Sequence, residues 1–274
     1  MLWRNTEGYD EFTECRLLRK APVTANITLQ LLGYAETAAC LAALILLLAR
    51  KRWSTYWALG WFLIAHLLTG LGLPVIIHFA DRLGKRTAYV TYFYVYWVAF
   101  GLESVLTLLV LYNLLRVTMG PLRGLQRLAS LAFCAVVLLA VFWAATSVLS
   151  HHIHSEIQFV VAAISQLQRT QSMVAILMLL TVVPALRLMG LSFRSPVFGV
   201  ALGLGILAIN DVLWSQWLTS HPYIGTGHDV IHGLVPCTIM TVWAVYFALP
   251  EPERHELALP AGSPLLRWNR MWLD

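Results

Sequence analysis

Apolar stretches of about 20 residues follow one another along most of this sequence, and short clusters of charged residues, Gly and Pro separate them. A helix of about 20 apolar residues is long enough to cross about 30 Å of hydrocarbon. Each stretch therefore predicts a transmembrane helix. The predicted spans cover residues 27–49, 53–79, 89–115, 125–149, 157–186, 196–218 and 229–249.

The pattern predicts an all-α, polytopic membrane protein, a seven transmembrane helix bundle with little soluble mass on either side. The composition agrees, because 59% of the residues are hydrophobic and only 12% are charged, whereas soluble domains have about 25% charged residues. We expect residues 1–26 to form an external arm, residues 27–249 the transmembrane domain, and residues 250–274 a cytoplasmic tail that lies partly on the membrane surface.

The distribution of basic residues predicts the orientation. Arg50, Lys51 and Arg52 follow the first span, and the third and fifth loops also contain Arg, whereas the fourth and sixth loops contain neither Lys nor Arg. Since cytoplasmic loops are enriched in Lys and Arg, the amino end is expected outside and the carboxyl end in the cytoplasm, although the second loop is basic too. This indicates a bacterial inner membrane protein whose partner is the lipid bilayer. The net charge of +5 forms no continuous basic face, so nucleic acid is not an expected partner.

Ionisable residues within the spans are the first candidates for function. A charge in the hydrocarbon region costs several kcal/mol, so such residues usually face the bundle interior and are paired. At a rise of about 1.5 Å per residue, those of this chain fall in one layer of the membrane. They are Glu36 in the first span, His66 in the second, Glu103 in the third, Arg169 in the fifth and Asp211 in the sixth.

Helical spacing predicts which way these side chains point. Arg169 continues a polar stripe with Gln166, and Glu103 continues one with Tyr96, so both stripes are expected to face inward. Arg169 could then pair with the acids simply to hold helices together. Alternatively, it could bind a small anionic or zwitterionic group in a polar cavity, and the excess of acids would require a bound proton or cation. The predicted ligand-binding residues are Arg169, Glu103, Glu36, Asp211, His66, Gln166, Tyr96 and Asn210.

Histidines gather at the predicted outer side of the membrane. His228 and His232 are four residues apart and would lie on one face of the last span, a spacing that suits metal ligands. With His78 they form a candidate zinc site. The alternatives are histidines without a shared role at the membrane surface and a cluster that responds to pH.

The His-x-x-x-His motif that opens the last span resembles that of the zinc-dependent membrane hydrolases that include alkaline ceramidases and the progestin and adiponectin receptors. The resemblance implies zinc bound by His228, His232 and His78. The chain departs from that family at Pro74, where the family has Ser, and in the position of its Asp81.

Two further stretches resemble uncharacterised seven-span membrane proteins of acidobacteria. One is the sequence Tyr-Val-Tyr-Trp at 94–97, followed by Glu103 and the Met-Gly-Pro-Leu-Arg-Gly-Leu-Gln-Arg stretch at 119–127. The other is Leu-Ser-Phe-Arg at 191–194, followed by Val-Phe-Gly-Val-Ala-Leu-Gly at 197–203. The resemblance covers all seven spans and implies no activity.

We therefore expect a small-molecule or lipid-headgroup binding protein that acts as a sensor or accessory subunit without a cofactor. Its loops are too short for a catalytic domain, so a signal would pass to another membrane or cytoplasmic protein. The alternative is a metal-dependent membrane hydrolase that uses zinc at the outer histidines, and the third expectation is a transporter. Gly199 and Gly203 offer a surface for close helix packing, expected within the bundle.

Overall fold

The computed structural model describes residues 23–79, 84–120, 122–149, 156–188, 192–220 and 226–250. Every regular element in these ranges is an α-helix. Their order along the chain is α2 (Val23–Ala49), α3 (Trp57–His78), α5 (Lys85–Thr118), α6 (Arg123–Leu149), α7 (Glu156–Leu188), α8 (Pro196–Ser220) and α9 (Thr226–Ala248).

Each predicted span coincides with one helix, and the all-α class is confirmed for the described residues. Six of these helices, α2 to α8, are long and apolar enough to cross a bilayer. The apolar part of α9, Gly233–Ala248, is shorter than those of the other six. The chain thus has the helices of a multi-pass membrane protein.

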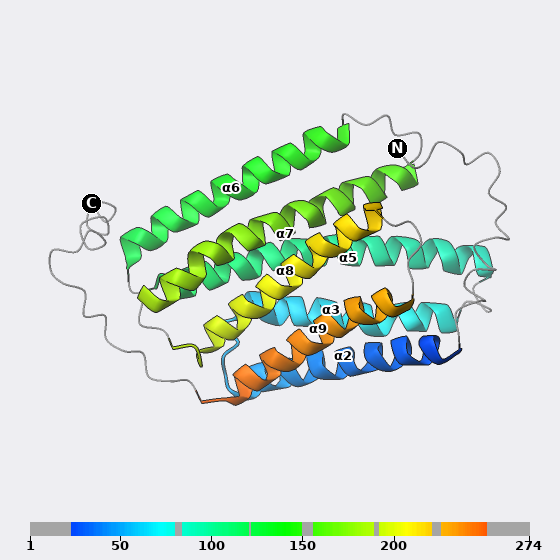
Figure 1. Ribbon diagram of the computed structural model, residues 1–274, viewed down its shortest axis with the longest axis horizontal. Helices are drawn as coiled ribbons and strands as arrows, with labels where there is room; N and C mark the ends of the chain where they lie inside the picture. Colours follow the sequence, from blue (N-terminus) through cyan, green and yellow to red (C-terminus); the bar gives the residue numbers. More distant parts are fainter. Residues whose placement is uncertain are drawn as a thin grey trace.

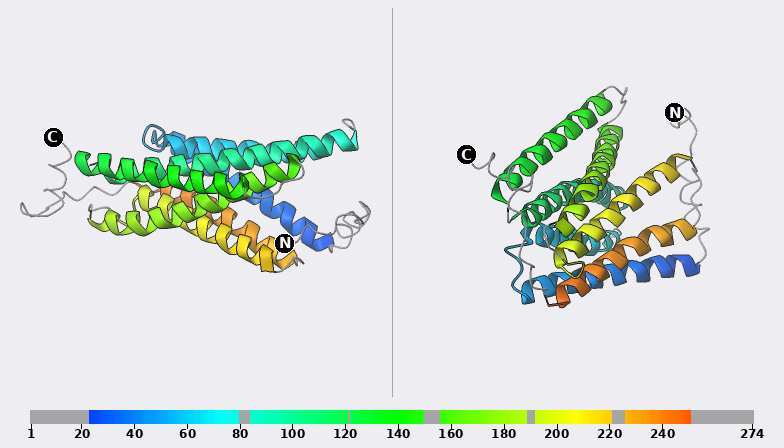
Figure 2. Two further views of the ribbon diagram at one scale, coloured as in Figure 1. Left: turned by 90° about the horizontal axis from the view of Figure 1, so that it is seen from above. Right: turned by 60° about the vertical axis from the view of Figure 1, so that its left-hand side comes forward.

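Six helices form a closed ring, and one lies outside it. Following the contacts around the ring, the order is α2, α3, α5, α7, α8 and α9, and the most extensive packing joins α9 back to α2. Helix α5 also contacts α8 across the ring. Figure 1 shows α2 and α9 side by side along one edge of the bundle and α6 along the opposite edge, and the right view of Figure 2 agrees.

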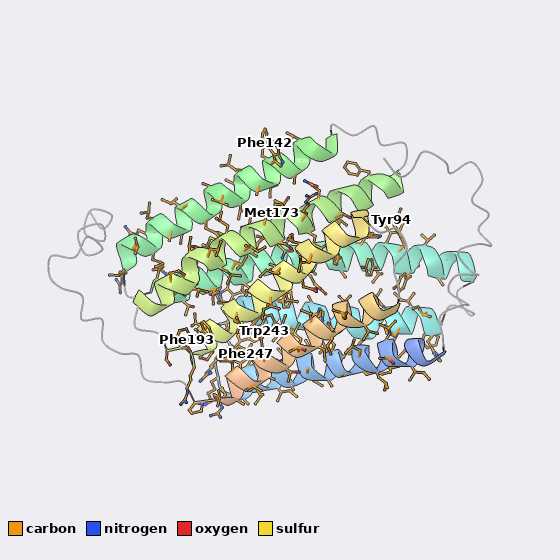
Figure 3. All side chains as sticks on the ribbon, viewed as in Figure 1. Tyr94, Phe142, Met173, Phe193, Trp243 and Phe247 are labelled. Atoms are coloured by element: carbon orange, nitrogen blue, oxygen red, sulfur yellow. The ribbon has the colours of Figure 1, made fainter. Side chains whose placement is uncertain are left out.

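Helix α6 packs only on α5 and α7 among the described elements, and large apolar side chains cover its outer face. Phe142 is 68% exposed and points away from the other helices in Figure 3. In an aqueous protein such a surface would be unstable, but in a bilayer it contacts lipid chains. The exposed residues of this face include Leu138, Leu139, Phe142 and Trp143.

The tightest packing lies at one end of the bundle, where α2, α5 and α9 end and α3 and α8 begin; we call it the closed end. Trp243 and Phe247 of α9 are fully buried there (Figure 3). The Phe247 ring meets Tyr56 edge-on at 5.6 Å, and the Trp243 ring meets Phe62 at 6.0 Å. Other fully buried members of this core are Leu47, Leu59, Leu63, Leu111, Val200 and Leu204.

Small residues of α8 let α9 approach closely. A Cβ atom added at Gly199 would overlap the Tyr246 ring, and one added at Gly203 would overlap the Trp243 indole. The indole N–H donates to the Gly199 carbonyl oxygen at 3.2 Å, which satisfies the only polar atom of a fully buried side chain. The expected use of these glycines within the bundle is confirmed.

The loop between α2 and α3 ties the closed end together. Arg50 donates to the Ala248 carbonyl oxygen at 2.6 Å, and Arg52 donates to that of Leu249 at 3.4 Å, so both guanidinium groups sit at the carboxyl end of α9. The last carbonyl groups of a helix have no partner within the helix, and cations there also favour the helix dipole. On the other side of the loop, Asn113 of α5 donates to the Thr55 carbonyl oxygen at 2.9 Å.

Candidate functional site

Three ionisable side chains from three helices meet in the middle of the bundle. Nε2 of His66 lies 2.9 Å from Oε1 of Glu36, and Nδ1 lies 3.3 Å from Oε2 of Glu103. Each of the three side chains is between 19% and 23% exposed. We call this group the Glu–His–Glu bridge; it links α2, α3 and α5.

The bridge lies near the middle of the apolar helices. Glu36, His66 and Glu103 each lie within two residues of the middle of the apolar part of their own helix. The Phe62 ring, one turn before His66, stacks on the imidazole at 6.0 Å and fixes its plane. This confirms that these three residues share one layer and face inward.

The geometry of the bridge limits its protonation states. A neutral imidazole has one N–H group and one bare nitrogen. Both ring nitrogens face a carboxyl oxygen, so with the fewest protons that satisfy both contacts either the imidazole is doubly protonated, or one carboxyl group is protonated and donates to the bare nitrogen. Both arrangements contain the same number of protons and leave one negative charge on the bridge.

Across the bundle, Asp211 of α8 is held by neutral groups. The hydroxyl of Ser172, a fully buried residue of α7, donates to Oδ2 of Asp211 at 3.3 Å, and the Gln168 amide also interacts with this carboxyl group. No Lys, Arg or His side chain among the described residues forms an ion pair with Asp211. Among the described residues, only hydroxyl and amide groups therefore contact this carboxyl group.

A cavity of about 180 Å³ lies between the bridge and Asp211. Five helices contribute to it, and its wall combines carboxyl, amide and hydroxyl groups with an apolar side. Small-molecule sites have this composition, a largely apolar surface with a few polar groups. The lining residues are Phe62, His66, Phe100, Glu103, Ser104, Thr107, Gln168, Gln171, Leu204, Leu207, Asp211, Pro236 and Met240.

Gln171 is the unsatisfied polar group of this cavity. Its side chain is only 7% exposed and lines the cavity, yet it forms no hydrogen bond with any part of the chain that the structure describes. By contrast, the Ser104 and Thr107 hydroxyls donate to carbonyl oxygens of their own helix. The amide atoms themselves are not sealed off, because they are not among the fully buried polar atoms without a partner. They are therefore available to a group inside the cavity that offers hydrogen bonds.

Arg169 does not lie where the polar stripe predicted. Its side chain is exposed, lines no part of the cavity and has no ion pair with Glu36, Glu103 or Asp211. The expected inward orientation is wrong because the neighbouring face of α7, with Gln168, is the one that packs inward. Arg169 is about 100° around the helix from Gln168. Glu36 and Glu103 contact His66 in its place.

The other predicted binding residues stand near the cavity without lining it. The Tyr96 ring stacks on Phe100 at 5.9 Å, and Phe100 does line the cavity. Gln166 and Asn210 are half-buried and are absent from the wall. The predicted residues that the structure brings together are thus Glu36, His66, Glu103 and Asp211.

The candidate metal ligands stay a prediction. His78 is exposed at the end of α3, where its ring contacts Phe79 edge-on at 5.4 Å. His228 and His232 belong to α9, but their side chains lie outside the described residues. Within the described residues, no three His, Cys, Asp or Glu side chains are close enough together to hold a metal ion.

Sequence reasoning missed Gln168 and Gln171. Between Ser165 and Ser172 every residue except Leu167 is polar, so polarity surrounds the whole helix and marks no single face. The available signal was the spacing of Gln168, Gln171 and Ser172, which are three and four residues apart and share one face. The apolar wall, from Phe62 to Met240, gave no signal because it is indistinguishable in sequence from ordinary packing.

Comparison of the chain with models of protein families, with functionally described proteins and with solved structures finds no match in any of the three.

Proposed function

We propose that this chain is an integral membrane protein that binds a small molecule or lipid headgroup in its central cavity and acts as a sensor or accessory subunit. The observation that carries the proposal is the cavity itself, in which the buried Gln171 amide has no partner among the described residues. An amide in an apolar bundle is costly unless something in the cavity binds it. A ligand there is the simplest reason to keep it.

Binding could be relayed because the polar contacts on the two sides of the cavity join different groups of helices. The Glu–His–Glu bridge joins α2, α3 and α5, whereas Ser172 and Asp211 join α7 and α8. A ligand that contacts both sides would favour one spacing of the two groups over another. The closed end lies at the loops that carry Arg50 and Arg194, and we place the partner protein there.

We further propose that all seven helices span a bacterial inner membrane, with the amino end outside. The support is the excess of Lys and Arg in the odd-numbered loops, including Arg50, Lys51 and Arg52. In this orientation a protease site inserted after Pro250 is cut only when the cytoplasmic side is accessible, as in inverted vesicles. Cleavage in intact spheroplasts would contradict the orientation.

Filling the cavity tests the binding proposal. Leu207 lines the cavity and Ile206, the residue before it, is exposed on the outer face of α8. The purified protein in nanodiscs is screened for thermal stabilisation by a panel of amines, amino acids, organic acids, phosphates and soluble headgroup analogues. A ligand at about 100 times its dissociation constant stabilises the folded state by about 2.7 kcal/mol.

We expect at least one compound of the panel to raise the melting temperature of the wild type and of Ile206→Trp, but not that of Leu207→Trp. Leu207→Phe, a smaller change, replaces it if the larger ring prevents folding. A panel without effect on the wild type, or an equal shift in the Leu207 variant, would refute binding in the cavity.

A further inference from the structure

The charges around the cavity do not balance. The Glu–His–Glu bridge retains one negative charge in either of its protonation states, and Asp211 adds another when ionised. No Lys or Arg is found among the described residues that line the cavity, and the nearest cation expected from sequence, Arg169, is exposed elsewhere. Negative charge in the centre of an apolar bundle is costly without a positive partner.

We infer that the ligand of this cavity is a small primary ammonium compound, which binds through Asp211 and Gln171. The inference rests on the proposed function and names its ligand class. Asp211 supplies the charge, because Ser172 and Gln168 hold it with neutral hydrogen bonds only. Gln171 supplies a carbonyl acceptor that nothing in the described chain uses.

The chemistry of the wall favours a primary ammonium group over other ligands. An ammonium group has three N–H donors and no acceptor, which suits a wall that offers the Asp211 carboxylate and the Gln171 carbonyl oxygen. An anion would meet carboxylates on both sides. A divalent metal ion would need several oxygen ligands around one point, and the described residues form no such cluster.

The remaining wall suits a hydrocarbon body on the amine. The apolar part of the lining is formed by Phe62, Phe100, Leu204, Leu207, Pro236 and Met240. A chain of a few carbon atoms would fill this part while the ammonium group reaches Asp211, which combines apolar contact with one charge-assisted hydrogen bond. Such an amine could be a free metabolite or the headgroup of phosphatidylethanolamine.

Matched pairs of charged and neutral probes test whether binding requires the positive charge of the ligand. Radiolabelled butylamine and 2-phenylethylamine, protonated at neutral pH, are compared with butan-1-ol and 2-phenylethanol, their neutral counterparts. Binding is measured by scintillation proximity on full-length protein in phosphatidylcholine nanodiscs, and binding to empty nanodiscs is subtracted. We expect the amines to bind the wild type at least roughly tenfold more tightly than the alcohols.

Asp211→Asn tests whether the Asp211 carboxylate binds the ammonium group, since asparagine has nearly the same shape as aspartate and its carbonyl oxygen can still accept from Ser172. The variant should lose roughly ten- to hundredfold in amine affinity and bind amine and alcohol alike, with an unchanged melting temperature without ligand. Arg169→Met, at a similar level of the bundle but outside the cavity, should bind as the wild type does. If Asp211→Asn unfolds, Gln171→Met gives the same comparison with a smaller, several-fold loss.

Phosphatidylethanolamine nanodiscs distinguish the two sources of the ammonium group. Loss of butylamine binding there assigns the site to the lipid headgroup, and unchanged binding assigns it to a free amine. Equal binding of amine and alcohol to the wild type, or undiminished amine binding by Asp211→Asn, overturns the inference, as does the absence of amine binding. The proposed function survives these results if another compound of the panel stabilises the wild type and Leu207→Trp abolishes the shift.

Discussion

The closed end of this bundle is held together differently from its polar layer. The polar layer is the level of the Glu–His–Glu bridge, Ser172 and Asp211. At the closed end, Trp243 and Phe247 are fully buried, and the glycines of α8 bring two helices into direct contact. In the polar layer, the helices meet through the Glu–His–Glu bridge and through the contact between Ser172 and Asp211. A cavity of about 180 Å³ lies between these two contacts. One region is filled with side chains, and the other surrounds a space.

This difference shows that two kinds of helix contact stabilise one small membrane protein. Inside a bilayer, helix association depends on close packing and on hydrogen bonds between helices, because lipid is as apolar as Leu. The closed end depends on close packing, and Arg50 in its loop also donates a hydrogen bond to the carboxyl end of α9. The polar layer depends on hydrogen bonds between helices, which surround the cavity.

The largest expected effect comes from removing the centre of the bridge. His66→Leu leaves Glu36 and Glu103 facing each other without the group between them, and breaking a buried charged pair in this way costs about 3–5 kcal/mol. We expect a clear fall in the melting temperature measured in detergent. Replacing Glu36 and Glu103 by Gln in the same variant should restore part of the loss. If His66→Leu melts at the wild-type temperature, the bridge contributes nothing to stability.

A smaller loss is expected at the closed end from Gly203→Ala. The added methyl group overlaps the Trp243 indole, and overpacking of this kind costs about 1–3 kcal/mol. The control is Gly72→Ala in α3, where an added Cβ atom meets nothing within 4 Å, so that only the gain in helix propensity remains. Urea or thermal unfolding of both variants gives the comparison. Equal stability of the two would show that the closed end is less tightly packed than described.

The smallest effect is expected for Arg169→Met. Arg169 is exposed and has no ion pair with the acids of the polar layer, so its removal breaks no contact within the described chain. We expect a change in stability within about 0.5 kcal/mol. A loss as large as that of His66→Leu would mean that Arg169 belongs to the charge balance of the polar layer after all.

Much of the fold follows from the apolar stretches. The predicted span 196–218 corresponds to Pro196–Ser220, and 27–49 to Val23–Ala49, because a 3.6-residue helix is the only regular structure that satisfies all backbone groups of a single segment in lipid. The shared level of Glu36, His66 and Glu103 in the bundle also followed from counting residues along each helix. Depth is a property of one helix alone.

The candidate site was only half predictable, since the rotation of a helix about its axis is not a property of one helix alone. In α7 the polar stretch around Arg169 surrounds the axis, and the packing of α8 and α5 decided that Gln168 and Gln171 face the cavity. The charge of Arg169 suggested an inward orientation. The neighbouring helices selected a different face.

By itself, the sequence determined how many apolar segments there are, how long they are, and at which depth each ionisable group lies, because lipid imposes these on every helix separately. Which groups meet was decided by the tertiary structure. His66 lies between Glu36 and Glu103, and Asp211 faces them across a cavity, because α2, α3, α5, α7, α8 and α9 close into one ring. Contacts between helices depend on the rotation and spacing of several segments at once, and no single segment contains that information.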